Sequence, residues 1–382
     1  MVARPRSYKI LMLCQAPPGR GGVGILAYLL ARSLAMLGHQ VLFVCPPFEG
    51  LSSEDYNIRI IPVLRRGLVT NFFVVLRLLL MESPDVIHAH RVFPVGLWAI
   101  VGKIFGIPIV VTSHGGDIQK DEEIGYGARL SKPVALLTWL VLKLIDKHVL
   151  VSKSMIADAV EAGSDLRKIR VIYNGIDPKI VPFAMQTDIL QRYGISNDDF
   201  VILYLGRLHP KKRPEDLIKA FPRVLEEIPN AKLIFAGKGE EESRLRKMSV
   251  NCGLKGKVIF LGFVTEDEKW RLFRRCDVFV LPSIVEGCPL SVLEAMACGK
   301  PVVVTRIRPF LEIVKNGETG ILVPPRSPER LADALINLAR DPRRRRRMGE
   351  RAKREVECRF AIDKVARRYL DVYRSAIEMS RR

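Results

Sequence analysis

Short apolar runs alternate with longer amphipathic stretches along the first part of the chain. The runs are rich in β-branched residues and are bounded by glycine, proline or polar residues, which is typical of buried strands. The stretches between them are long enough for helices, and this alternation predicts βα units that form a parallel sheet. The predicted strands of this series lie at KILMLC (9–14), HQVLFVCP (39–46), DVIHAH (85–90), PIVVTSHGG (108–116) and KHVLVS (147–152).

A second series of apolar runs begins after the turn-forming stretch NGIDP (174–178). Its pattern predicts a second parallel sheet, so we expect an α/β protein of two Rossmann-like, doubly wound domains that face each other across a cleft. The first domain should span residues 1–178 and the second residues 179–359. The predicted strands of the second series lie at VILYLG (201–206), KLIFAG (232–237), VIFLG (258–262), VFVLP (278–282) and PVVVT (301–305).

The length of 382 residues and a hydrophobic share of 48% are enough for two cores and are not typical of a disordered chain. No secretory signal peptide is expected, because the first residues lead directly into the strand at 9–14. The apolar stretch 133–152 is interrupted by Lys143 and Asp146 and is too short to span a membrane. The seven cysteines are odd in number and lack a CxxC spacing, which predicts reduced thiols in a cytoplasmic protein.

The net charge of +20 is unevenly distributed. Residues 340–382 contain 16 Lys or Arg and 7 Asp or Glu, so this segment carries nearly half of the excess. Such a run is either an ordinary solvated helix face or a contact with an anionic membrane surface, which would make the protein peripheral on the membrane. No nucleic-acid-binding motif accompanies it, so nucleic acid is not an expected partner. The oligomeric state is left open.

Two glutamates, Glu286 and Glu294, lie eight positions apart in the apolar segment 278–305. The segment predicts a strand, a loop, a helix with Pro289 in its first turn and Gly299 at its end, and a second strand. A helix N-terminus at the carboxyl edge of a parallel sheet favours an anion. Two carboxylates beside an anion site indicate acceptors for hydroxyl groups, one for each of two neighbouring polyol rings.

Two other strand-to-helix loops carry candidate ligands for phosphate. In PPGRGGVG the glycines Gly21 and Gly22 either let the backbone approach a phosphate or sugar closely or serve a tight turn. In GRLHPKK the loop presents Arg207, Lys211 and Lys212. Fixed cations suit a diphosphate leaving group, because negative charge develops there in the transition state. Taken alone, a basic loop is more often plain surface.

Together and in this order, the motifs resemble those of the retaining glycosyltransferases with the GT-B fold that are often called family 4. The resemblance covers essentially the whole chain, and the E-x7-E signature is its most specific part. It implies transfer of a sugar from a nucleotide-diphosphate sugar to an acceptor hydroxyl, and a long helix within residues 360–382 that packs back on the first domain. The resemblance is carried by GGVG, TSHGGD, VSKSM, VIYNGID, GRLHPKKRPEDLIKAF, FAGKGE, LGFV and EGCPLSVLEAMACGKPVV.

The resemblance also implies roles for individual residues. Glu294 would bind the nucleotide ribose and Glu286 the hydroxyls of the donor sugar, while Arg207 and Lys212 would hold the donor diphosphate. The backbone of the LGFV motif would contact the base. The further donor-binding candidates are Gly21, Gly22, Gly206, Lys211, Phe263, Val264, Gly287, Cys288, Pro289 and Leu290.

The chain departs from the family at one position of the phosphate-binding loop. Family members usually carry Lys-Gly where this chain has Lys212 and Arg213. Either Lys211 or Lys212 would then be the phosphate ligand. Alignment through Leu208 and Ala220 favours Lys212.

Histidines follow two of the predicted strands. His114 opens the polar loop HGGD, and the resemblance implies that it faces the donor sugar across the cleft, with Asp117 near the acceptor. A lone histidine in a strand pattern is more often structural. His88 alternates with apolar residues and is expected in the core, whereas His90 lies at the strand end and is expected on the acceptor side of the cleft.

No Asp-x-Asp motif occurs in the sequence, so no metal and no other cofactor is expected. Retention of configuration is possible by double displacement through a carboxylate nucleophile. The resemblance instead implies a front-side route, in which the departing phosphate oxygen assists deprotonation of the acceptor hydroxyl. In that route Glu286 binds and orients the sugar.

The acceptor and the donor base are not determined by the sequence. The helix predicted at 69–81, preceded by Arg65 and Arg66, either lies on a membrane and suits a lipid acceptor or faces the core, and its periodicity favours the core. Two alternative functions are a GT-B nucleotide-sugar 2-epimerase and a nucleotide-sugar-binding protein without catalysis.

Overall fold

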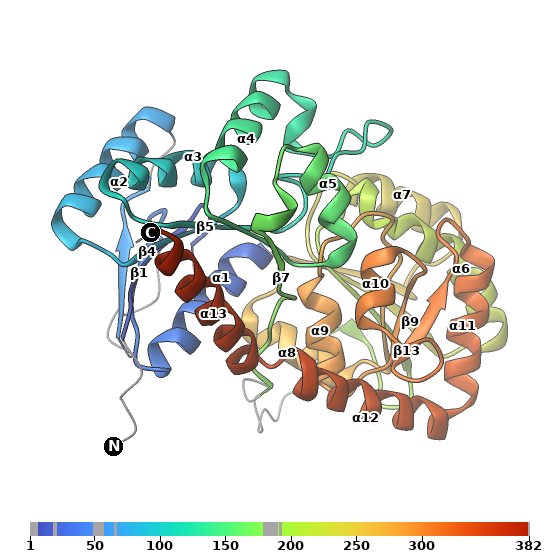
Figure 1. The fold of residues 1–382 in the computed structure, drawn as a ribbon. Helices are drawn as coiled ribbons and strands as arrows, with labels where there is room; N and C mark the ends of the chain where they lie inside the picture. Colours follow the sequence, from blue (N-terminus) through green and yellow to red (C-terminus); the bar gives the residue numbers. More distant parts are fainter. Residues whose placement is uncertain are drawn as a thin grey trace, which may run out of the picture. The chain divides into compact units, whose positions relative to one another are not determined.

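The computed structural model describes residues 7–17, 21–48, 57–64, 67–178, 190 and 193–380. The chain folds into two compact units, the first formed by Met1–Asp177 with Ala361–Arg382 and the second by Pro178–Phe360. The sequence places each boundary one residue away from these positions. Each unit is a parallel sheet flanked by helices, which is the predicted α/β architecture (Figure 1).

Within its described residues, unit 1 contains a seven-stranded parallel sheet in the order β3-β2-β1-β4-β5-β6-β7. The order reverses between β1 and β4, which in doubly wound sheets marks the edge where ligands bind. The strands are β1 (Lys9–Cys14), β2 (Gln40–Cys45), β3 (Ile58–Pro62), β4 (Val86–His90), β5 (Ile109–Ser113), β6 (Lys147–Leu150) and β7 (Ile169–Val171).

Helices cover both faces of this sheet, with α1 and α13 on one face and α2, α3 and α4 on the other (Figure 1). The short 3-10 helix η2 (Ile100–Phe105) continues α3. The α-helices of unit 1 are α1 (Gly21–Met36), α2 (Leu68–Glu82), α3 (Leu97–Ala99), α4 (Lys132–Leu144), α5 (Ile156–Glu161) and α13 (Ile362–Ser380).

The described part of unit 2 contains a six-stranded parallel sheet in the order β10-β9-β8-β11-β12-β13. Its order reverses between β8 and β11, and both strands lead into the loops that carry the predicted donor ligands. The strands are β8 (Phe200–Leu205), β9 (Ala231–Ala236), β10 (Val258–Gly262), β11 (Val278–Leu281), β12 (Val302–Thr305) and β13 (Gly320–Val323). The helices are α6 (Pro214–Glu227), α7 (Glu242–Asn251), α8 (Glu266–Arg275), α9 (Leu290–Ala297), α10 (Arg308–Ile313), α11 (Pro328–Arg340) and α12 (Pro342–Arg359).

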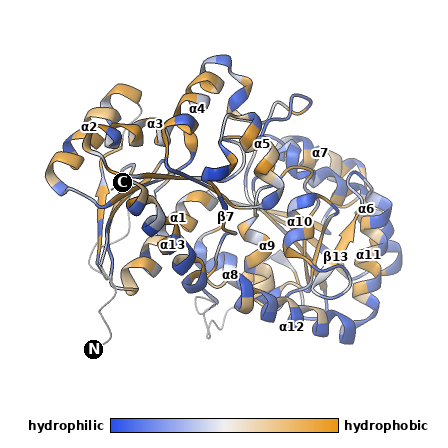
Figure 2. Cartoon of the chain, in the orientation of Figure 1, coloured by the Kyte–Doolittle hydropathy of each residue, from blue (hydrophilic) through white to orange (hydrophobic). Residues whose placement is uncertain are grey.

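Most strands are continuous apolar runs because helices cover both faces of each sheet (Figure 2). The short apolar runs by which strands are predicted from the sequence do not include β3, β7 and β13. All three of these strands lie at the edge of a sheet. Their inward and outward positions differ in burial, so their sequences are less uniformly apolar.

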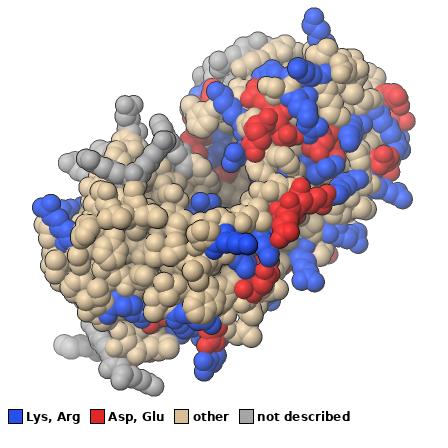
Figure 3. Space-filling model, turned by 90° about the horizontal axis from the view of Figure 1, so that it is seen from above, with Lys and Arg blue, Asp and Glu red and all other residues tan. Residues whose placement is uncertain are grey.

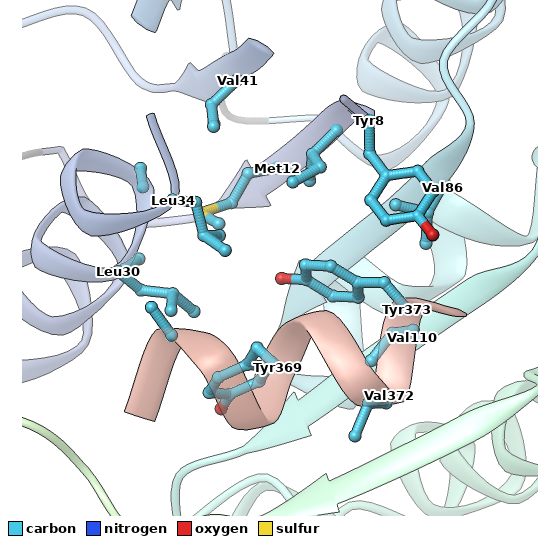
Figure 4. Packing of buried hydrophobic residues seen from close by; sticks show 14 of the residues in the cluster. Tyr8, Met12, Leu30, Leu34, Val41, Val86, Val110, Tyr369, Val372 and Tyr373 are labelled. Carbon is cyan, nitrogen blue, oxygen red and sulfur yellow. The ribbon is translucent and has the colours of Figure 1, made fainter. Parts of the chain in front are cut away.

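Helix α13 belongs to the core of unit 1. Tyr369, Val372 and Tyr373 pack among side chains of α1 and the sheet, including Leu34 and Met12 (Figure 4). The helical spacing of these apolar residues predicts one buried face, and the structure confirms it. A segment that follows the whole of unit 2 in the sequence thus completes the hydrophobic core of unit 1.

Helix α12 carries the basic run. Met348, Ala352 and Val356 form its buried face, and the helix packs on α9. The arginines of its first turns that are exposed are Arg343, Arg344, Arg346 and Arg347. This exposed basic face agrees with the solvated-face interpretation, and a membrane contact through it stays a prediction. No helix in the described parts of the chain combines the length and the apolar character needed to cross a bilayer.

Candidate functional site

The loops after β8 and β9 lie against each other in unit 2. A Cβ atom at Gly237 would lie 2.1 Å from the carbonyl oxygen of Gly206, and one at Gly239 would lie 2.1 Å from that of Leu208. Only glycine fits such a close approach of two backbones. The amide of Leu208 donates to the carbonyl of Lys238 at 3.1 Å. This contact fixes the backbone of the loop that carries the predicted phosphate ligands.

Glu286 lies on the loop after β11 and meets a lysine from the loop after β8. Its Oε1 lies 2.7 Å from Nζ of Lys212 and accepts a hydrogen bond of 2.8 Å from Oγ of Ser283. The amide of Ile284 donates to the carbonyl of Lys211 at 2.8 Å, which ties the two loops together. The structure therefore brings two predicted catalytic side chains into direct contact.

Glu294 is the second predicted carboxylate and lies on α9. Its Oε1 is 2.6 Å from Nζ of Lys269 on α8, and the same Nζ is 2.7 Å from Glu266. Both side chains of the central pair are buried, at 4% exposed for Glu294 and 7% for Lys269. The predicted donor-binding residues that lead into α9 are also buried, and they are Gly287, Cys288, Pro289 and Leu290.

The two carboxylates differ in their electrostatic surroundings. Burial raises the pKa of Glu286, but the charges of Lys212 and Lys211 with two hydrogen bonds outweigh burial, so this pKa lies below its ordinary value. Burial also raises the pKa of Glu294, and there it prevails over the charge of Lys269, so that pKa lies above its ordinary value. Glu286 is therefore held as a carboxylate, and the two residues differ in their electrostatic surroundings.

Arg207 presents its guanidinium group at the surface of unit 2, where the side chain is 68% exposed. Its Nη2 lies 3.2 Å from Oε2 of Glu240, and Oε1 of the same carboxylate lies 3.4 Å from Nε2 of His209. The Oη of Tyr204 donates to the carbonyl of Arg207 at 2.8 Å. The backbone of Arg207 is thus fixed while its charge stays accessible.

The remaining donor-binding candidates lie at loop ends of the two units. In unit 2, Phe263 follows β10 with 68% exposure, and Val264 is half-buried beside it. In unit 1, Gly21 and Gly22 begin α1, and both are exposed. Residues 18–20 of the preceding loop lie outside the described residues.

In unit 1, His90 and His114 end neighbouring strands, and Nδ1 of His90 lies 3.1 Å from Nε2 of His114. Asp117 holds the loops that follow. Its Oδ1 accepts from the amides of His114 and Gly115 at 3.2 Å each, and its Oδ2 accepts from that of Val92 at 3.1 Å. With 2% of its surface exposed, Asp117 shapes the loops around His114. Contact of Asp117 with an acceptor stays a prediction.

Both imidazoles of this pair are held neutral. Burial and the charge of Arg91 lower the pKa of His114 to about 3, and burial places the pKa of His90 well below its ordinary value. Within the described residues, Nδ1 of His114 and Nε2 of His90 have no hydrogen-bond partner. The two rings therefore offer one donor and one acceptor for which the described part of unit 1 supplies no counterpart.

His88 is a core residue, as its alternation with apolar residues predicts. It is fully buried, with Nδ1 2.7 Å from Oη of Tyr373 and Nε2 2.8 Å from Oγ1 of Thr112. The Oη of Tyr369 lies 3.1 Å from the same Thr112 hydroxyl. Helix α13 thus supplies the polar partners of the strands beneath His90 and His114.

A large apolar cavity lies at the carboxyl edge of the unit 1 sheet. Its volume is about 820 Å³, and its lining includes Gln15 after β1, Pro46 after β2, and Phe93 and Trp98 after β4. This edge of a doubly wound sheet is where ligands bind. Unit 1 therefore has space for a partly apolar ligand.

Sequence reasoning did not identify Lys269, Ser283 or Glu240, although each contacts a predicted site residue. A signal for Lys269 exists in the helical phase of α8, because Lys269 falls on the same buried side as Leu272 and Phe273. The other two partners depend on how loops fold. Among the described residues, no cluster of three or more His, Cys, Asp or Glu side chains is arranged to hold a metal ion.

Comparison with known proteins gives two adjoining family matches. The model for Glycosyl transferases group 1 matches residues 185–355, and the model for Glycosyltransferase Family 4 matches residues 20–180. An uncharacterized glycosyltransferase of Methanocaldococcus jannaschii is 31% identical, over 97% of this chain and 99% of the relative. The N-acetyl-alpha-D-glucosaminyl L-malate synthase of Bacillus anthracis is 28% identical, over 93% of this chain and 94% of the relative.

Solved structures share the fold. Anabaena HepE in complex with UDP-glucose superposes with a TM-score of 0.79 at 22% identity, over 96% of this chain and 100% of that one. The sucrose-phosphate synthase of Thermosynechococcus elongatus gives a TM-score of 0.80 at 21% identity, over 98% of this chain and 100% of that one. Both units thus have counterparts in one known two-domain architecture.

Proposed function

We propose that this chain, which belongs to the family 4 glycosyltransferases with the GT-B fold, moves a sugar from a nucleoside-diphosphate sugar to an acceptor hydroxyl with retention of configuration. One observation carries the proposal. The strand, loop and helix from β11 to α9 hold two buried carboxylates, Glu286 and Glu294, each on its own lysine. The pair lies at the reversal point of the unit 2 sheet, beside the start of α9.

In this proposal the donor binds in unit 2. Glu294 accepts hydrogen bonds from the ribose, and Glu286 accepts them from the hydroxyls of the sugar. Lys212 holds Glu286 as a carboxylate, and its ammonium group has further N–H donors for a phosphate oxygen. Arg207 adds an accessible cation on the same loop. The structural neighbour in complex with UDP-glucose supports a nucleoside-diphosphate sugar as the donor, and the choice of base is left to experiment.

Transfer in this proposal occurs on one face of the sugar. The bond from the anomeric carbon to the diphosphate oxygen breaks, the bond to the acceptor oxygen forms, and the acceptor proton moves to the departing phosphate oxygen. Lys212 and Arg207 stabilise the negative charge that develops on the diphosphate. Glu286 orients the sugar and stabilises positive charge at the anomeric centre. The neutral ring of His114 hydrogen-bonds a sugar hydroxyl, and we assign the acceptor to unit 1.

The first test is a thermal-shift screen of UDP-, GDP- and ADP-sugars. A donor at 100 times its dissociation constant should add about 2.7 kcal/mol to the free energy of unfolding. The stabilising donor is then incubated with candidate acceptors, and NMR reports the anomeric configuration of the product. Retained configuration is expected. An inverted product, or efficient epimerisation of the donor without an acceptor, would contradict the proposal.

The second test concerns the absence of a metal requirement. Because Lys212 and Arg207 neutralise the diphosphate in this proposal, transfer should continue in excess EDTA. Loss of activity in EDTA, with recovery on addition of magnesium or manganese, would show that a divalent cation performs this role instead.

A further inference from the structure

Helix α2 has an apolar outward side. Val69, Phe73 and Leu80 recur at helical spacing and are 70%, 60% and 64% exposed. The opposite side, with Val75 and Leu79, is buried against unit 1. A helix on the surface of a soluble protein normally turns polar residues outward. The sequence favours a core-facing helix at this position, and the structure shows that only one of its two apolar sides faces the core.

Helix α4 repeats this arrangement. Leu136 is 66% exposed and Trp139 is 46% exposed, and Leu140 and Leu144 on the same side are 40% and 41% exposed. Its inward side contains the fully buried Val141. Figure 2 shows both α2 and α4 as largely hydrophobic helices.

The outward sides of both helices lie over the same face of the unit 1 sheet (Figure 1). α3 packs against both α2 and α4, and η2, which continues α3, adds Ile104 with 76% exposure. We call this surface the apolar face. Figure 3 looks onto it and shows unit 1 as a broad area without charge, with Lys and Arg and some Asp and Glu at its edges. The apolar face comprises Val69, Phe73, Leu80, Ile104, Leu136 and Trp139.

The exposed charges on α2, α4 and η2 themselves are positive. α4 and η2 contain no Asp or Glu. The acidic residue of α2 is Glu82, which is 11% exposed and pairs with Lys9. The exposed cations on these helices include Arg77, Lys132 and Lys143. Nζ of Lys143 lies 5.6 Å from the centre of the Trp139 ring.

We propose that unit 1 docks on an anionic lipid bilayer through the apolar face. Exposed apolar side chains, a tryptophan that is half in solvent and flanking lysines are the composition that inserts at the boundary between headgroups and acyl chains. The cations then meet anionic headgroups. This proposal does not depend on the transfer reaction.

The same charges disfavour a second copy of the chain as the occupant. A two-fold dimer through the apolar face would bring its cations together, and α4 and η2 offer no acid to oppose them. Lysine is also depleted at protein interfaces. An anionic bilayer, by contrast, matches both the apolar area and the exposed cations of these helices.

The tryptophans provide a built-in probe of docking. Trp139 is 46% exposed, whereas Trp98 and Trp270 are 4% and 5% exposed. Vesicles of phosphatidylcholine with phosphatidylglycerol are titrated into the full chain. Docking should shift the emission to shorter wavelength, because Trp139 alone of the three can exchange water for lipid. An unchanged spectrum at saturating lipid overturns the proposal.

Co-sedimentation with the same vesicles tests the apolar contacts. The variant Phe73→Glu/Leu136→Glu should bind at least about a hundred-fold more weakly, because two side chains that enter the lipid on docking are lost and each should contribute more than about 1.4 kcal/mol. The matched control is Val250→Glu on α7, which is 66% exposed and lies in unit 2, and its binding should equal that of the unaltered chain. Equal binding by the double variant overturns the proposal.

Two further measurements complete the design. If the double variant loses its cooperative unfolding transition, Ile104→Glu replaces it, since this side chain is the most exposed of the apolar face. Analytical ultracentrifugation without lipid tests the competing occupant. A dimer that dissociates on Phe73→Glu/Leu136→Glu would assign the apolar face to a second copy, and the bilayer proposal would then be wrong.

Discussion

Nζ of Lys212 and Oε1 of Glu286 lie 2.7 Å apart and join two loops that are 74 positions apart in the sequence. The loops follow β8 and β11, neighbouring strands at the reversal point of the unit 2 sheet. Both groups are largely buried. Removal of either charge would leave the other buried without its partner, which is energetically unfavourable. The pair therefore holds the loop of the proposed diphosphate ligands against the loop of the proposed sugar ligand.

Glu286→Gln should reduce turnover while leaving nucleoside-diphosphate binding nearly unchanged. The change removes negative charge that stabilises the anomeric centre in the transition state, and a loss of about a hundred-fold in kcat is expected. Free nucleoside diphosphate has no sugar, so its dissociation constant should change by less than about three-fold. Calorimetry and steady-state rates measure the two effects. Ser283→Ala, which removes one hydrogen bond to Oε1, should give a smaller loss in kcat.

Glu294→Gln should weaken binding of the nucleotide sugar and of the free nucleoside diphosphate equally, by about 1–3 kcal/mol. It should also destabilise unit 2 by about 1–3 kcal/mol, because the buried Lys269 loses its nearest carboxylate but keeps Glu266 at 2.7 Å. The double variant Lys269→Met/Glu294→Gln should recover stability but not binding. Recovery of binding together with stability would mean that Glu294 acts only through the fold.

The free energy of unfolding should fall as the pH drops from 6.5 towards 4, in part because of His148. This ring is buried between Oγ of Ser113 at 2.8 Å and Oγ of Ser164 at 2.9 Å, and burial lowers its pKa from 6.5 to about 4. Between these values the unfolded chain binds the proton and the folded chain does not, so acid favours unfolding by up to about 1.4 kcal/mol per pH unit. Urea titrations at several pH values measure the free energy of unfolding. Between pH 6.5 and 4 this free energy should depend less steeply on pH in His148→Asn than in the unaltered chain.

Tyr373→Phe should destabilise unit 1 by about 1–3 kcal/mol. The substitution keeps the ring in the core but removes the hydroxyl 2.7 Å from Nδ1 of His88, which is fully buried and has no access to water there. The control is Tyr193→Phe, whose side chain is 43% exposed and which should lie within about 0.5 kcal/mol of the unaltered chain. Equal urea midpoints for both variants would show that His88 does not need this bond.

The fold was predictable from the sequence where burial is symmetrical. Central strands such as β1 and β11 are apolar on both faces and stand out as continuous runs. The edge strands β3 and β7 contain Arg59 and Arg170, which interrupt the apolar run, whereas the edge strand β10 is an uninterrupted apolar run and was identified. Helix α13 was predictable because its buried face recurs over its whole length.

The sequence indicated individual candidate residues of the site, but it did not indicate which side chains contact each other. Glu286 and Glu294 stand out because acids are rare in an apolar segment. Their partners Lys212 and Lys269 come from other loops and helices, so the pairing depends on how the strands are ordered in the sheet. The exposure of Phe73 and Leu136 was not predictable for a similar reason, since apolar periodicity cannot tell which side of a helix meets the sheet.

The contribution of α13 to the core of unit 1 affects how the chain folds during its synthesis. A ribosome releases the strands of unit 1 first, then all of unit 2, and only afterwards Tyr369 and Tyr373. Limited proteolysis of chains stalled after Phe360 would reveal which unit is already resistant. Until α13 emerges, Met12 and Leu34 lack part of their packing partners. We therefore expect unit 2 to complete its folding before unit 1, and the nascent unit 1 to bind chaperones in the meantime.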